Sequence, residues 1–149
     1  MIIGGPPCQG FSLKGKKLGL EDPRNFLFIE YLHLVQELKP LVFVIENVKS
    51  LMSTSNGWFK NQIISEIKKL GYEVSVGIVR ASDYGVPQNR ERVIFLCSKN
   101  KAISLPEQTV KKTTTVRDAI EDLAYLNSNE GDFEQSYITE AKTEYQKLM

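Results

Sequence analysis

Four side chains that can carry out covalent or acid–base chemistry lie in three short polar segments of this chain. Cys8 follows Pro6-Pro7, Glu46 follows an apolar run, and Arg90 and Arg92 flank a glutamate. A thiolate can add to an electron-poor ring carbon, and a carboxyl group can protonate the ring nitrogen that takes up the charge. Guanidinium groups can bind the ring carbonyl or a nearby phosphate. Taken alone, each residue is more simply explained as part of a turn, a helix cap or a surface charge. A functional site therefore requires that the fold bring these residues together.

The apolar pattern predicts the elements that would position these residues. Strands are expected at residues 1–3, 41–45, 74–78 and 93–97, and helices at 23–38 and 59–70. Leu27, Tyr31, Leu34, Val35 and Leu38 recur at helical spacing, as do Phe59, Ile63, Ile67 and Leu70 before the terminating Gly71. The alternation of strands and helices predicts a doubly wound α/β sheet, mostly parallel. Thr115 is expected to cap a short helix, and residues 127–149 show little pattern.

Ligands of such sheets bind beyond the carboxyl ends of the strands. Cys8 follows the first strand and Glu46 the second, and a helical crossover between them makes the two strands parallel. The loop over residues 81–91 follows the third strand and leads through Gln88 and Arg90 to Arg92. We therefore expect a thiol, a carboxylate and two guanidinium groups to converge at one edge of the sheet.

Composition describes an ordinary globular domain and leaves the ligand open. The chain has 149 residues, of which 42% are hydrophobic and 25% charged, and its 19 basic and 18 acidic side chains nearly balance. No apolar run reaches membrane-spanning length, and no secretory leader or disulfide framework is expected, so a reducing cytoplasm is the default. Cys97 lies inside an apolar strand and is expected to be a packed core thiol. His33, the only histidine, lies off the apolar stripe and is expected at the surface; no metal ligands are assigned.

Three motifs in this order resemble the DNA cytosine-5 methyltransferases. Residues 4–12, Gly-Gly-Pro-Pro-Cys-Gln-Gly-Phe-Ser, are similar to the family's nucleophile loop. Residues 46–48 match its Glu-Asn-Val motif and residues 88–92 its Gln-x-Arg-x-Arg motif, while Asp22, Arg24 and Leu27 resemble the helix start between the first two. The resemblance implies a partial Rossmann-like, S-adenosylmethionine-dependent methyltransferase fold whose final strand is antiparallel.

The resemblance also implies a mechanism and a role for each motif residue. Cys8 would attack carbon 6 of a flipped-out cytosine, Glu46 would protonate or hydrogen-bond ring nitrogen 3, and carbon 5 would then accept the methyl group. Arg92 would hold the cytosine carbonyl or its phosphate, and Arg90 would support Glu46 or the backbone. Pro7 and Leu27 match positions that line the S-adenosylmethionine pocket. Substrate contacts are further expected from Gln9, Ser12, Asn47 and Gln88.

The resemblance covers residues 1–126 well and residues 127–149 more loosely. The family's glycine-rich cofactor loop would precede residue 1, and its target-recognition domain would follow residue 149, so we expect the middle part of a catalytic domain that is inactive alone. Residues 127–149 are expected to lead into the recognition domain. The implied partner is double-stranded DNA, bound by the full-length enzyme of a bacterial restriction-modification system in the cytoplasm. Further partners could be the missing parts of the enzyme or a second copy of this chain. The alternative functions are an RNA cytosine-5 methyltransferase with the same chemistry and a non-catalytic or split-enzyme subunit.

Overall fold

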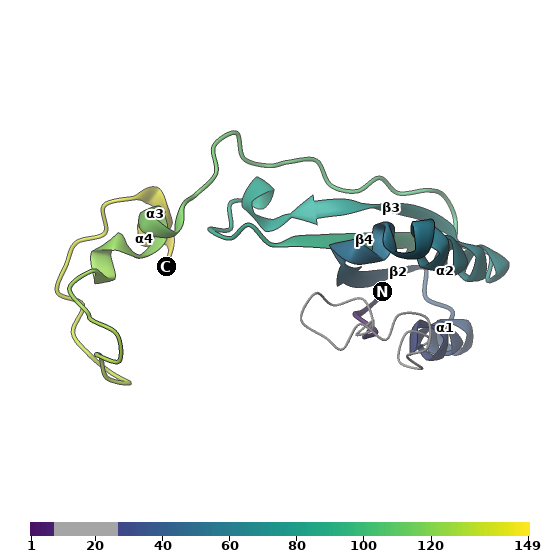
Figure 1. Cartoon of the computed structure of the whole chain (residues 1–149), viewed down its shortest axis with the longest axis horizontal. Coiled ribbons are helices and arrows are strands. Elements are labelled where there is room, and N and C mark those ends of the chain that lie inside the picture. Colours follow the sequence, from purple (N-terminus) through teal and green to yellow (C-terminus); the bar gives the residue numbers. More distant parts are fainter. Residues whose placement is uncertain (8–26) are drawn as a thin grey trace. The chain divides into compact units, whose positions relative to one another are not determined.

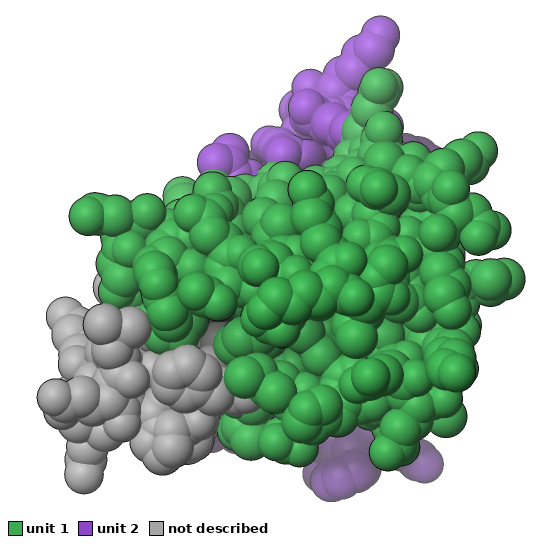
Figure 2. All heavy atoms as spheres, turned by 90° about the vertical axis from the view of Figure 1, so that its right-hand side faces the viewer, with its two compact units in different colours: residues 1–79, 91–107 green, residues 80–90, 108–149 purple. Residues whose placement is uncertain are grey.

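The computed structural model describes residues 1–7 and 27–149, which group into two compact units (Figures 1 and 2). Unit 1 comprises residues 1–79 and 91–107, and unit 2 comprises residues 80–90 and 108–149. Within the described ranges, no helix is long and apolar enough to cross a membrane. Cys8, Gln9, Ser12, Asp22 and Arg24 lie outside the described residues, so their expected places are not addressed by the structure.

A four-stranded sheet forms the centre of unit 1 (Figure 1). Its strands are β1 (Ile2–Gly4), β2 (Val42–Val48), β3 (Glu73–Arg80) and β4 (Glu91–Ser98), in the order β1-β2-β4-β3. β1 runs parallel to β2, as the helical crossover predicts, and β4 lies antiparallel against β2. The predicted α/β class and the antiparallel final strand are therefore confirmed.

Two helices pack on one face of the sheet and build the core of unit 1. α1 (Leu27–Leu38) and α2 (Trp58–Lys69) bury their apolar sides against alternate residues of β2 and β4. The short 3-10 helices Lys49–Met52 and Thr54–Gly57 connect β2 to α2. The fully enclosed core side chains include Val35, Phe43, Ile45, Leu51, Phe59, Ile63, Ile67, Val93, Phe95 and Cys97.

The buried face of α1 differs from the predicted one. Phe28, Leu32 and Val35 are buried, whereas Leu34 and Leu38 of the predicted stripe are 43% and 61% exposed. The segment is apolar on most of its circumference, so spacing alone did not select the side that the sheet would cover. The face of α2 was predicted correctly: Phe59, Ile63 and Ile67 are buried, and Gly71, with φ 79°, ends the helix in the left-handed conformation.

Unit 2 is built from short elements joined by loops. They are the 3-10 helices Ala81–Tyr84 and Glu121–Leu123, and the α-helices α3 (Val116–Ile120) and α4 (Glu144–Leu148). Thr115 caps α3 as predicted, in a reciprocal capping box with Asp118. α4 was missed, although Thr143 and Gln146 have the Thr-x-x-Gln spacing of a capping box and form one in the structure.

Candidate functional site

The register between β2 and β4 brings Glu46 and Arg92 together. Glu46 pairs across the sheet with Ile94, and Arg92 pairs with Val48, so the two charged side chains are diagonal neighbours on the face opposite the helices. Arg92 Nε lies 2.7 Å from Glu46 Oε1, with the two side chains 25% and 39% exposed. A pair this accessible to water contributes at most about 1 kcal/mol to stability. Its main physical effect is to fix the orientation of the carboxyl group.

Both residues lie inside strands, contrary to our expectation of strand-end loops. β2 continues through Glu46 to Val48, and β4 begins at Glu91, because the antiparallel pairing of the two strands extends to the Val48–Arg92 pair. Strand backbone holds a side chain more rigidly than a loop does, so the Glu46–Arg92 geometry is imposed by the sheet itself.

The chain that leads from β1 toward Cys8 lies against Glu46. An added Cβ at Gly5 would stand 3.1 Å from Glu46 Oε2, so this oxygen faces the Gly5 backbone while Arg92 engages the other oxygen. Contacts of this length are tighter than most real Cβ atoms make, so a side chain at this position would displace the Glu46 carboxyl group by a few tenths of an ångström. The carboxyl group therefore has one oxygen held by a cation and one directed at the motif loop.

Asn47 ties the same loop to the end of β2. Its Nδ2 donates to the Pro6 carbonyl at 2.9 Å, and its Oδ1 accepts from Val48 N–H at 2.8 Å, while the residue is 6% exposed. The expected role of Asn47 was contact with substrate. The Nδ2 bond fixes Pro6, two residues before Cys8, and the expected substrate contact of Asn47 stays a prediction.

Tyr31 of α1 braces the two parallel strands beneath this loop. Its hydroxyl donates to Val44 O at 3.0 Å and lies 3.5 Å from Ile2 O, and burial raises its pKa to about 12, with a smaller contribution from Cys97. The ring occupies the space beside Gly4, where an added Cβ would fall 2.3 Å from Tyr31 Cε2. Sequence reasoning placed Tyr31 on the apolar stripe and missed this bracing role. The available signal was the Gly4-Gly5 pair, whose lack of side chains leaves room for a large neighbour.

A second ion pair flanks the first at the start of β4. Lys49 Nζ lies 2.6 Å from Glu91 Oε2, and Arg92 Nη1 donates to the Glu91 carbonyl at 2.8 Å. Positive and negative side chains therefore alternate from Lys49 through Glu91 and Arg92 to Glu46. Neither Lys49 nor Glu91 was singled out from the sequence, because the sequence around a charged residue does not show which distant residue it will pair with.

The remaining predicted residues are placed as follows. Pro7 is exposed, and Leu27, at the first turn of α1, is 37% exposed. Gln88 and Arg90 are exposed residues of unit 2, in the connection between β3 and β4. Within unit 1, the cation that contacts Glu46 is Arg92; the expectation from the resemblance had given Arg92 to the substrate and the support of Glu46 to Arg90.

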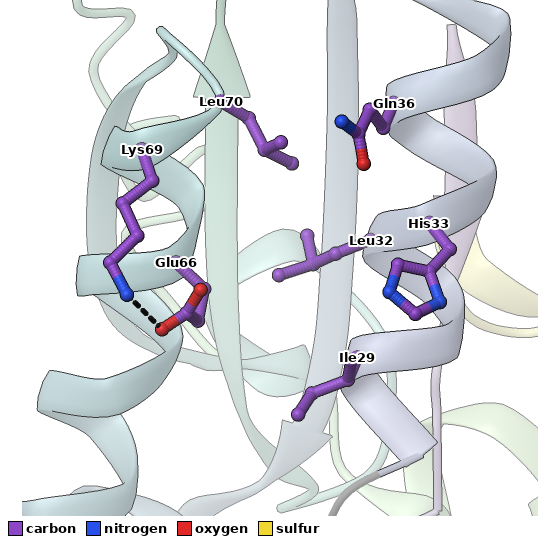
Figure 3. Close-up of a pocket in the computed structure, with 7 residues that line it drawn as sticks. All are labelled: Ile29, Leu32, His33, Gln36, Glu66, Lys69 and Leu70. Carbon is purple, nitrogen blue, oxygen red and sulfur yellow. Dashed lines mark hydrogen bonds and ion pairs between the residues drawn. The ribbon is translucent and has the colours of Figure 1, made fainter.

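Cys97 and His33 have the structural roles that were expected of them. Cys97 is fully buried, and burial raises the pKa of its thiol to about 12, so it is a core residue and not a nucleophile. His33 is largely exposed on α1 and lies 3.4 Å from Glu30. It lines a shallow groove between α1 and α2 together with Leu32 and Leu70 (Figure 3), on the helical layer of unit 1 and not on the sheet face that carries Glu46.

Known proteins are similar to this chain in sequence and in fold. The chain is 40% identical over 158 aligned residues to the type II methyltransferase M.DdeI of Desulfomicrobium norvegicum, covering 99% of this chain and 38% of that protein. It is 35% identical over 175 aligned residues to the type II methyltransferase M.AgeI of Thalassovita gelatinovora, covering 100% of this chain and 41% of the relative. The chain thus spans about two fifths of the length of these curated relatives.

Solved structures give the same result for the fold. A crystal structure described as a DNA modification methyltransferase encoded within an E. coli prophage superposes with a TM-score of 0.62 at 35% identity, over 79% of this chain and 33% of that one. The Entamoeba histolytica methyltransferase EhMeth superposes with a TM-score of 0.57 at 20% identity, over 87% of this chain and 39% of that one, and supports the fold alone. The family model described as C-5 cytosine-specific DNA methylase matches residues 1–148. The chain, which pairs Glu46 with Arg92 across its sheet, therefore belongs to the C-5 cytosine-specific DNA methylase family.

Proposed function

We propose that this chain is the part of a DNA cytosine-5 methyltransferase that holds the nucleophile and the carboxyl group acting on the cytosine ring. The observation that carries the proposal is the Glu46 carboxyl group. Arg92 engages Oε1 at 2.7 Å, while Oε2 faces Gly5, three residues before Cys8. Family membership and the type II methyltransferase relatives support DNA as the substrate.

Each residue has a defined task in the proposed reaction. The Cys8 thiolate forms a bond to carbon 6 of the cytosine, while ring nitrogen 3 receives a proton or a hydrogen bond from Glu46. Arg92 keeps the carboxyl group in place, so that the oxygen facing the loop meets the ring. Carbon 5 thereby becomes nucleophilic and accepts a methyl group. A base then removes the carbon 5 proton, the bond from carbon 6 to sulfur breaks, and the thiolate is regenerated, while ring nitrogen 3 returns to Glu46 any proton that it took.

The cytosine must leave the double helix for this chemistry, because carbons 5 and 6 cannot be approached by the thiol from within stacked bases. Asn47 contributes by holding Pro6 at 2.9 Å, which fixes the loop that presents Cys8 to the flipped base. Gly4 and Gly5 contribute by letting this loop lie close to Tyr31 and Glu46.

The described residues fit S-adenosylmethionine as the methyl donor. Pro7 and Leu27 expose apolar surface to a ligand, and the cradle beside Gly5 lacks a side chain that would block approach to Glu46. S-adenosylmethionine supplies an electrophilic methyl group bound to a sulfonium. The contribution of this chain would be to contact the donor through Pro7 and Leu27 and to orient the cytosine with Glu46 and Arg92.

Methyl transfer is proposed for the complete protein and not for these 149 residues alone, because the chain spans only about two fifths of its relatives. The relatives' type II names support a role in restriction-modification, and for the complete protein we propose the bacterial cytoplasm as location and double-stranded DNA as partner.

A mechanism-based probe tests the proposal. Fluorine at carbon 5 of the target cytosine blocks the final proton removal, so complete protein with S-adenosylmethionine should form a denaturant-stable complex with such DNA. The Cys8→Ser variant should form none, because a hydroxyl is almost wholly protonated at neutral pH, while DNA binding should persist. Cys97→Ala is the matched control and should retain the adduct, and the isolated 149-residue chain should form none. An adduct that persists in Cys8→Ser, or that maps to Cys97, contradicts the assignment.

A further inference from the structure

Unit 2 contains a polar pocket in which Gln88 and Asn89 of the Gln-x-Arg-x-Arg segment meet residues that belong to no motif. It has a volume of about 440 Å³ and is lined chiefly by hydroxyl and amide side chains. They are Ser82, Gln88, Asn89, Thr113, Thr114 and Thr115. No aromatic, acidic or basic side chain is among the lining residues. A pocket of this composition cannot stack a base or hold a cation strongly; it offers hydrogen-bond donors.

Backbone hydrogen bonds between two segments of unit 2 build the pocket. The carbonyl of Asp83 accepts from Thr109 N–H at 3.0 Å and from Val110 N–H at 3.3 Å, which ties the segment before Thr113 to the turn after Ser82. Gly85, with φ 85°, closes that turn next to Val110. The pocket is therefore part of the fold of unit 2 and not a gap between loose loops.

Several side chains of the pocket have hydrogen-bond donors that are not used within the described structure. The described structure shows no hydrogen bond from the side chains of Gln88, Asn89, Thr113 or Thr114. Ser82 is only 3% exposed, yet its Oγ has no hydrogen-bond partner among the described residues. Buried hydroxyl groups are almost always hydrogen-bonded, so this atom is available to bond a polar group that enters the pocket.

Positive charge lies next to these donors. Lys111 and Lys112 directly precede Thr113 and are exposed, and no acidic residue occurs in residues 108–117. Glu107 and Asp118 border this window, and the Asp118 carboxylate accepts hydrogen bonds from the Thr115 N–H and hydroxyl. These two bonds, aided by Lys112 and Arg117, lower the pKa of Asp118, so its charge is committed to the cap of α3.

We propose that this pocket binds a backbone phosphate of double-stranded DNA, with Thr113, Thr114, Gln88 and Asn89 donating to phosphate oxygens and Lys111 and Lys112 adding charge. Hydroxyl, amide and lysine groups are the usual phosphate contacts of DNA-binding proteins. The inference rests on the proposed function in taking DNA as the ligand, and it adds a contact that positions the duplex independently of its sequence.

The test measures DNA binding by the complete protein that contains this chain, because the chain spans only about two fifths of its relatives. Fluorescence anisotropy with a labelled duplex of roughly 20 base pairs gives the binding constant between about 0.05 and 0.2 M salt, where counterion release dominates. Lys111→Gln/Lys112→Gln should flatten the slope of log K against log salt by about 2 and weaken binding roughly 8-fold per lysine at 0.1 M salt. The charge-matched control is Lys68→Gln/Lys101→Gln, which removes two exposed lysines of unit 1 and should leave binding unchanged.

A second variant separates the pocket from charge alone. Thr113→Val/Thr114→Val keeps shape and charge but removes two donors, so binding should weaken roughly tenfold with an unchanged salt slope. The proposal is overturned if the valine variant of the complete protein binds the duplex as wild type does, or if both lysine variants weaken binding equally. Failure of the proposed function looks different: DNA binding would show these effects while the fluorocytosine adduct at Cys8 would not form.

Discussion

Asn47 gives the sharpest test of how the motif loop is held. Asn47→Ala removes the donor to Pro6 O at 2.9 Å and the acceptor of Val48 N–H at 2.8 Å. A fully buried group that loses its partner costs about 1–3 kcal/mol. Both backbone groups are only partly buried, so water compensates for some of the loss, and we expect the free energy of unfolding to fall by about 2–3 kcal/mol.

The assay is urea unfolding of the chain, with midpoints converted to free energies at constant slope. Asn61→Ala is the matched control, because Asn61 is an exposed residue of α2 and its loss should change stability by no more than about 0.5 kcal/mol. Amide hydrogen exchange at Val48 should accelerate in Asn47→Ala and not in the control. Equal stability of the two variants would refute the account of Asn47 as the residue that ties Pro6 to β2.

Asn47→Asp adds a pH dependence whose sign follows from the same geometry. Burial and repulsion from the Pro6 carbonyl oxygen would raise the folded-state pKa of the new carboxyl group, and together they outweigh the Val48 N–H bond, which favours the charged form. The protonated acid can donate to Pro6 as the amide does. Stability should therefore approach that of wild type below the unfolded-state pKa and decline as the pH rises through the raised folded-state pKa. A deficit relative to wild type that does not change with pH would contradict this geometry.

Two further outcomes are expected. Cys97 should resist a thiol reagent at pH 8 in the folded chain and react only on unfolding, because burial raises its pKa to about 12; rapid native-state modification would show that it is accessible. Gly4→Ala should destabilise the chain by about 1–3 kcal/mol, because the new methyl would stand 2.3 Å from a Tyr31 ring held by its hydrogen bond to Val44. In a Tyr31→Ala background the same change should cost little, and a double-mutant cycle without coupling would rule out the clash.

The sequence alone determined the elements whose patterns are strong. β2 and β4 are built around the apolar runs 41–45 and 93–97, and α2 carries its buried apolar residues at helical spacing, so their type and approximate position followed from local chemistry. The motifs around Cys8, Glu46 and Arg92 likewise indicated the family, because residue type and order are properties of the sequence. α1 and α4 were predicted less well. α1 is apolar on too many sides for its pattern to identify the buried face, and α4 is too short to show a periodic pattern.

Tertiary structure decided which of these residues meet. Glu46 and Arg92 are 46 residues apart in sequence, and only the register that sets Val48 opposite Arg92 makes them neighbours. A shift of this register by one residue would turn Arg92 to the other face of the sheet, which no local pattern of Gln-x-Arg-x-Arg could reveal. The bracing by Tyr31 and the bond from Asn47 to Pro6 depend on the same docking of α1 and β1 onto β2. The sequence therefore identifies the reactive groups, and long-range strand pairing sets their geometry. The register of that pairing depends on contacts along the whole sheet, so no single residue reveals it.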